Sequence, residues 1–130
     1  MTIRGGQIDR FKKNAEEQFA PEIAEHLEKE HPQAIAGMDR EVVLSRVSRE
    51  LRRGQGYGFE RKLDLLTFVV LAFVIGPQFD VQPTVAGVLN DPGIPPERKF
   101  DFLFANTPRE EWDLMATHSG GSAPWDERSR

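Results

Sequence analysis

The sequence predicts an all-α protein: a compact single-domain bundle of about five or six helices around a central hydrophobic helix at roughly residues 60–75, with shorter C-terminal helices. Three observations lead to this prediction. Apolar residues recur at spacings of three or four in the first half of the chain, as on amphipathic helices. The most apolar run ends at a Gly-Pro pair. The second half has prolines where short helices begin, and no segment shows a convincing strand pattern.

The first helical pattern covers residues 7–31. Its apolar stripe consists of Ile8, Phe11, Ala15, Phe19, Ile23 and Leu27. Pro21 predicts a kink or break near Ala20, because proline lacks the backbone donor and clashes with the preceding turn. Pro21 could instead be the first residue of a new helix. Since the stripe keeps its phase across the proline, we favour one long, kinked helix that ends at His31.

The second pattern runs from Asp39, a plausible N-cap, to about Arg53. Its apolar stripe is formed by Val43, Val47 and Leu51, and other positions carry Arg40, Arg46, Arg49, Arg52 and Arg53. Gly54 and Gly56 predict the end of this helix. Residues 54–58 resemble a phosphate loop only superficially, because the Lys-Ser/Thr pair and the preceding strand are missing. We expect an interhelix turn whose glycines allow positive φ.

The third helix is predicted over residues 60–75. Its longest apolar run, residues 65–75, is broken by Thr67 and is shorter than the about 18 residues that a membrane span needs. The run is preceded by Arg61, Lys62 and Asp64 and followed by Gly76 and Pro77. Extending it in either direction therefore adds charge or helix breakers, and a buried core helix is favoured over a membrane span.

Proline-rich sequence after residue 76 predicts short helices joined by turns. Pro83 starts a helix that ends near Asn90, and residues 91–93 form a turn. A further helix opens at residues 95–96, with an apolar face formed by Phe100, Leu103 and Phe104.

The last helix is predicted to start at residues 107–110, where Thr caps, Pro occupies the first position and Glu completes a capping box. Its inner face would consist of Trp112, Met115 and Ala116. Residues 1–117 are thus expected to form a single helical domain, and residues 118–130, which lack periodicity, a flexible tail.

Composition limits the classes of function. The chain has 130 residues, a formal net charge of −4 and no basic tract, so nucleic acid is not an expected partner. The absence of cysteine excludes disulfides, a thiol nucleophile and Cys-type zinc sites. It fits a reducing compartment, and the N-terminus lacks the apolar segment of a secretory signal. A cytoplasmic location is therefore expected.

No catalytic, cofactor-binding or metal-binding residues are predicted, and the chain is expected not to be an enzyme. His26 and His31 are five residues apart, about 140° around a helix, and so should not share a face. The HExxH and GxSxG patterns are absent. An enzyme would require Tyr57, Asp64, Asp80 and His26 to meet in one cleft. The simplest role for Asp80 is structural, as a cap or as the ion-pair partner of an arginine such as Arg52, Arg53 or Arg61.

Residues around the central helix resemble a known group of proteins. The order is Tyr57-Gly58-Phe59, Arg61, an apolar helix, Gly76, Phe79-Asp80 and Pro83, followed by Leu89, Asp91 and residues 95–99. Over about residues 5–105 this resembles small helical accessory proteins encoded beside bacterial type VI secretion effector genes. The chain departs from the pattern at Lys62, where an acidic residue is expected, and at Pro77.

The resemblance implies a protein-interaction module, an accessory or adaptor for loading a type VI effector, whose partner would be an effector or a spike component. An immunity protein that neutralises a toxin is the alternative, because an acidic helical domain would associate rapidly with a basic target. Tyr57, Arg61, Phe79 and Asp80, here called the collar, could close the helix ends or face a partner. Exposed apolar residues of the C-terminal helices and Trp125 are other candidates for the binding surface. The oligomeric state stays open.

Overall fold

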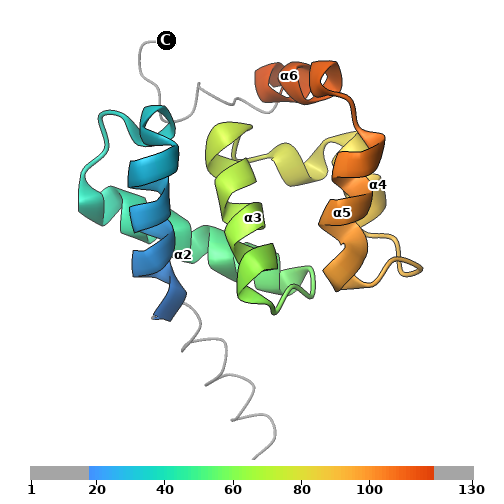
Figure 1. The fold of residues 1–130 in the computed structure, drawn as a ribbon, viewed down its shortest axis with the longest axis horizontal. Coiled ribbons are helices and arrows are strands. Elements are labelled where there is room, and N and C mark those ends of the chain that lie inside the picture. Colours follow the sequence, from blue (N-terminus) through green and yellow to red (C-terminus); the bar gives the residue numbers. More distant parts are fainter. Residues whose placement is uncertain (1–17, 119–130) are drawn as a thin grey trace, which may run out of the picture.

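The computed structural model describes residues 18–118 (Figure 1). The predicted all-helical bundle is confirmed: within this range the chain forms six α-helices and two short 3-10 turns, and no strand. The α-helices are residues 18–30, α2 (Arg40–Gly56), α3 (Lys62–Val74), α4 (Pro83–Leu89), α5 (Pro96–Asn106) and α6 (Arg109–His118). The 3-10 turns are η1 (Pro32–Ile35) and η2 (Phe79–Val81).

Helix α3 is the centre of the bundle, as predicted. In Figure 1 it stands between the N-terminal helix and the pair α4 and α5, and it contacts α2, α5 and both 3-10 turns. It begins two residues after the predicted start and has Ile75 as its C-cap. Leu65, Phe68 and Phe73 are completely or almost completely buried. None of the helices among residues 18–118 has both the length and the apolar character needed to cross a bilayer.

An aromatic cluster joins the two halves of the bundle across α3. The ring of Phe68 lies 5.0 Å from that of Phe79 in η2 and 6.2 Å from that of Phe59, centroid to centroid. Phe59 in turn stacks on Phe100 of α5 at 4.8 Å. Such offset and edge-on contacts stabilise by about 1 kcal/mol each beyond simple burial. The segments before and after α3 are therefore held to it by the same rings.

Helix α2 ends at Gly56, the second of the two glycines predicted to stop it, whereas the predicted stop at Gly54 is wrong. The helix continues to Gly56, and Gly54 is buried at the contact with α3. A Cβ atom on Gly54 would lie 3.2 Å from Cδ2 of Leu65 and 3.3 Å from Cγ of Phe68. Of the glycines in residues 54–58, only Gly58 has a positive φ, at 97°. Gly54 therefore allows α2 and α3 to approach closely. From the sequence alone, a glycine in this role cannot be distinguished from a glycine that ends a helix.

The N-terminal part of the chain agrees with the predicted stripe where it is described. Ile23 and Leu27 are buried, and Phe19 packs against the core. Pro21 lies inside the helix, which is described from residue 18 onward. The predicted earlier part of this helix, from residue 7, lies outside the described residues. Asp39 occupies the N-cap position of α2, but its side chain makes no capping hydrogen bond.

The C-terminal helices follow the predicted order, with two corrections. Phe104, predicted to be on the inner face of α5, is 48% exposed, and Lys99 is buried instead. Helix α6 extends to His118, one residue into the predicted tail. The rest of that tail, including Trp125, lies outside the described residues. Within α6, Met115 is buried, and Trp112 and Ala116 pack against the core as predicted.

The close contact at Gly54 gives a testable pair of substitutions. Gly54→Val should lower the free energy of unfolding by about 2 kcal/mol, because the added atoms have no space between α2 and α3. Gly56→Ala is the matched control: nothing lies within 4 Å of its Cβ position, and alanine should leave stability unchanged or raise it by up to about 1 kcal/mol. Urea denaturation measures both values. Equal stability of the two variants would contradict the close approach.

Candidate functional site

The four collar residues do not form one site. Tyr57 and Asp80 belong to a buried polar network, and the Phe79 ring is part of the core. Arg61 lies at the start of α3 and takes part in a different set of contacts. Its guanidinium binds the Asp64 carboxylate through two hydrogen bonds, of 2.8 and 3.1 Å, and donates to the carbonyl of Glu97 at 3.0 Å. Arg61 thus connects the start of α3 to α5.

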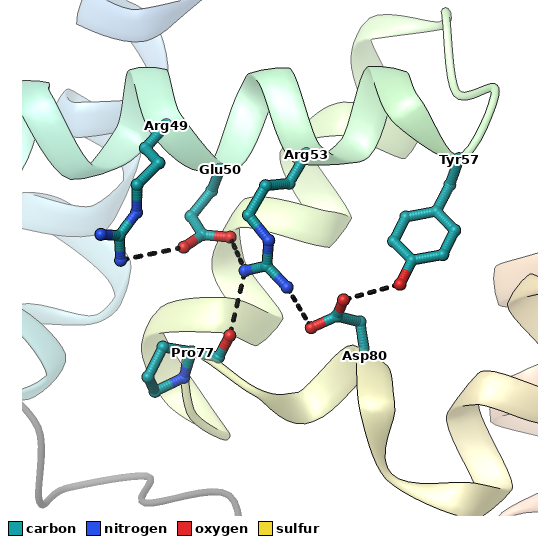
Figure 2. A network of polar contacts seen from close by, with 6 residues as sticks. All are labelled: Arg49, Glu50, Arg53, Tyr57, Pro77 and Asp80. Atoms are coloured by element: carbon teal, nitrogen blue, oxygen red, sulfur yellow. Dashed lines mark hydrogen bonds and ion pairs between the residues drawn. The ribbon is translucent and has the colours of Figure 1, made fainter.

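The polar network is organised by Arg53 (Figure 2). Its Nη1 donates to Glu50 Oε1 at 2.5 Å and to the carbonyl oxygen of Pro77 at 3.0 Å. Its Nη2 donates to Asp80 Oδ1, and the Tyr57 hydroxyl donates to Asp80 Oδ2 at 2.7 Å. We call these five residues the Arg53 network. It confirms an arginine partner for Asp80.

Local structure explains why these side chains meet. Glu50, Arg53 and Tyr57 are spaced by three and four residues, so they share one face of the C-terminal end of α2. Figure 2 shows them pointing toward the turn that carries Pro77 and Asp80. Gly76, with a φ of 147°, begins this turn, and the amide of Phe79 donates to its carbonyl at 3.1 Å. The network therefore joins α2 to the segment that follows α3.

Burial makes the network electrostatically unusual. Glu50 is 1% exposed and Asp80 3%, and the two carboxylates share one guanidinium. Burial raises the pKa of Glu50, and the nearby Arg53 and Arg49 only partly oppose this effect. Burial, together with the hydrogen bond to Asp80, raises the pKa of Tyr57 to about 12. The Tyr57 hydroxyl therefore remains a proton donor to Asp80 at neutral pH.

The sequence alone does not indicate the role of Glu50, because a glutamate on an arginine-rich helix normally faces solvent. Its Oε2 atom is buried and has no hydrogen-bond partner. The Arg49 guanidinium lies 3.7 Å from this atom, as an ion pair without a hydrogen bond. The useful signal was its spacing of three residues from Arg53 and seven from Tyr57.

Lys99 is a second polar residue whose role the sequence did not indicate. It lies on α5 and is 5% exposed. Its Nζ donates to the backbone carbonyls of Val88, Leu89 and Asp91 at 3.1, 2.9 and 2.9 Å. These carbonyls come from the C-terminal end of α4 and the turn after it, where the helix leaves acceptors without intrahelical donors. Lys99 thus caps α4 from α5 with all three of its protons.

The two histidines lie closer together than their spacing indicated. His26 and His31 were not expected to share a helix face, but their rings are 5.6 Å apart between centroids. His31 follows the last residue of the N-terminal helix, where the helical angle no longer applies. No group of three or more histidine, aspartate or glutamate side chains within residues 18–118 is placed to hold a metal ion.

Groups with catalytic potential are dispersed. Asp80 binds both Arg53 and Tyr57, Asp64 binds Arg61, and the His26 ring lies beside that of His31. Of the four groups, Tyr57 and Asp80 contact each other, and Asp64 and His26 each have a different partner. The described surface has a shallow hollow, on the outward face of α2, lined by Glu41, Val42, Ser45, Arg46 and Arg49. The Arg53 network is best described as a partly buried junction between α2 and the turn after α3.

The hydrogen bond between Tyr57 and Asp80 can be tested by a double-mutant cycle. Tyr57→Phe should lower the free energy of unfolding by about 1.5 kcal/mol, because a buried carboxylate loses a donor. Asp80→Asn should cost more, since Arg53 also loses its charged partner. In the double variant the costs should be clearly less than additive. Additive costs in urea denaturation would show that the two groups do not interact.

The capping role of Lys99 predicts a large effect for an apolar substitution. Lys99→Met keeps most of the side-chain volume but removes a charged donor from three carbonyls, of which those of Val88 and Asp91 keep a backbone donor, so the free energy of unfolding should fall by about 2 kcal/mol. Lys29→Met is the control, because that side chain is 70% exposed and 3.9 Å from Glu25, where an ion pair contributes little. Thermal denaturation compares the two. A Lys99→Met variant as stable as the control would contradict the capping role.

Comparisons with protein-family models, with curated proteins and with solved structures found no match to this chain. The geometry of the described residues and the motif order in the sequence are therefore the basis for assigning a function.

Proposed function

We propose that this chain is a non-enzymatic protein-interaction module that works in the cytoplasm as an accessory or adaptor protein for loading a type VI secretion effector. The order of motifs from Tyr57 to residue 99 supports the type VI context. The dispersed polar groups support a role in binding rather than catalysis. The net charge of −4 favours a protein partner, an effector or a spike component, over nucleic acid.

The collar itself is a poor candidate for the binding surface. Asp80 and Phe79 are buried, and both oxygens of Asp80 are already hydrogen-bonded within the chain. Arg61 is exposed, but it is engaged by Asp64 and by the carbonyl of Glu97. These residues preserve the arrangement of α2, α3 and α5. A partner would therefore bind another surface that this arrangement presents.

One observation carries the proposal: an aromatic pair on the C-terminal helices. Phe104 of α5 is 48% exposed, and its ring contacts that of Trp112 of α6 at 5.7 Å between centroids. Phe104 also stacks on the core residue Phe100 at 6.1 Å. Phe100 thus supports the pair on its core side, and the Phe104 ring is partly open to solvent. Aromatic side chains of this kind dominate the binding energy of many interfaces.

The chain contains a matched control for this surface. Phe102 is on the same helix and is 47% exposed, but it lies about 200° around α5 from Phe104. Phe104→Ser and Phe102→Ser remove the same amount of apolar surface from opposite sides. If the Phe104–Trp112 pair is the binding surface, only the first substitution should weaken binding.

The experiment is a binding measurement with the products of the neighbouring secretion genes. We expect one of them to co-purify with the chain, and we expect Phe104→Ser to weaken its affinity at least tenfold by calorimetry, about 1.4 kcal/mol. Phe102→Ser should bind normally. Equal loss in both variants would exclude the proposed surface, and failure of every neighbouring product to bind would exclude the adaptor function.

An immunity protein is the second candidate, and the charge of the N-terminal helix favours it. Glu22, Glu25, Glu28 and Glu30 are all exposed on this helix, and the first three form exposed ion pairs with Lys62, Lys29 and Arg40 that a basic partner could replace. Such a face would attract a basic toxin and speed association. Deleting the gene distinguishes the two functions. Loss of an immunity protein should poison cells that carry the neighbouring toxin gene, whereas loss of an adaptor should abolish toxin delivery and leave the cells healthy.

A further inference from the structure

The burial of the Glu50 carboxylate is explained neither by the needs of helix packing nor by the proposed partner surface. Its side chain is 1% exposed, and one carboxylate oxygen is buried without a hydrogen bond. Burying an ionised carboxylate costs folding free energy unless its oxygens accept hydrogen bonds, whereas burying the neutral acid costs much less. The site therefore favours a bound proton by its geometry. Helix-forming requirements alone would be met equally well by glutamine at this position.

The charged groups around Glu50 cannot fully neutralise it. Among the described residues, Arg49 and Arg53 face it from α2 and Asp80 faces it from η2. Arg53, whose side chain is 31% exposed, divides its charge between the ionised Glu50 and Asp80, which leaves these three groups with one net negative charge. Arg49 has a side chain that is 52% exposed, so solvent screens its contribution. Tyr57 acts on Asp80 rather than on Glu50.

The same guanidinium also holds the turn after α3. Nη1 of Arg53 donates both to Glu50 and to the Pro77 carbonyl, and Nη2 donates to Asp80. All three contacts exist together, because each Nη1 proton has its own acceptor, so Glu50 and Asp80 share the charge of Arg53 rather than its protons. When Glu50 is neutral, the full charge of Arg53 acts on Asp80 and on the Pro77 carbonyl, and the docking of this turn on α2 is strengthened.

We propose that Glu50 is a proton-controlled latch: protonated Glu50 leaves Arg53 to hold η2 against α2, and ionised Glu50 loosens that junction. The latch does not depend on the proposed partner or on the Phe104–Trp112 pair. The expected pH dependence of stability is opposite to that of ordinary acid denaturation, in which the folded protein stabilises the ionised form of its carboxylates. The direction follows from linkage. The folded state binds more protons at Glu50 than the unfolded state, so stability falls as the pH rises.

Native-state hydrogen exchange tests the latch at the junction itself. The amides of Phe79 and Val81 donate to the carbonyls of Gly76 and Gln78, so their protection factors report opening of η2. As the pH is lowered toward the ordinary glutamate pKa of 4.5, these protection factors should rise, by up to about tenfold per pH unit for one linked proton. In Glu50→Gln they should be high and independent of pH.

Glu41→Gln is the matched control, because Glu41 is exposed on the same helix. It should keep the pH dependence of the unmodified protein. A pH-independent unmodified protein, or an unchanged slope in Glu50→Gln, would overturn the proposal.

A direct titration covers the case in which Glu50→Gln does not fold. Carbon-13 NMR of the glutamate carboxyl groups in the unmodified protein should show Glu50 titrating above the range of the other glutamates, in step with protection of Phe79 and Val81. Arg49→Gln should move this titration to still higher pH, because it removes a positive charge 3.7 Å from Oε2. Titration of Glu50 in the ordinary range would overturn the latch.

Discussion

The bundle depends on one shared guanidinium. Arg53 connects a carboxylate on its own helix to a backbone carbonyl and a carboxylate that follow α3 in the chain. These contacts cross the central helix, whose Phe68 ring lies 5.7 Å from the Arg53 guanidinium carbon. Polar and aromatic contacts therefore meet at the same point. Because buried polar groups are costly when unpaired, this junction defines one arrangement of α2, α3 and η2 more strictly than apolar packing would.

Two other features make this arrangement possible. The absence of a side chain at Gly54 brings α2 close to Leu65 and Phe68 of α3. On the opposite side, Lys99 holds the C-terminal end of α4 to α5. In both cases a residue with an ordinary local role, a helix stop or a solvated charge, acts instead through a contact distant in sequence. The collar residues follow the same pattern, since they mainly join elements of the fold.

The motif residues around α3 join elements of the fold. Tyr57, Phe59, Arg61, Phe79 and Asp80 connect α2, α3 and the C-terminal helices. A motif that preserves a scaffold is compatible with different partners on different surfaces. Recognition would then depend on side chains that the scaffold displays, such as Phe104. The net negative charge and the arginines of α2 would bias which partners approach.

The sequence by itself determined the helical class, the order of the elements and the central place of α3. Apolar periodicity and the prolines carry this local information, and α4 begins at Pro83 as they indicate. It also identified an arginine partner for Asp80, but among three candidates. Tertiary structure alone decided that Gly54 continues a helix, that Glu50 and Lys99 are buried, that Phe104 is exposed and that His26 meets His31. The reason is physical: burial and pairing of polar groups depend on neighbours brought together by packing, and these neighbours are not encoded in local spacing.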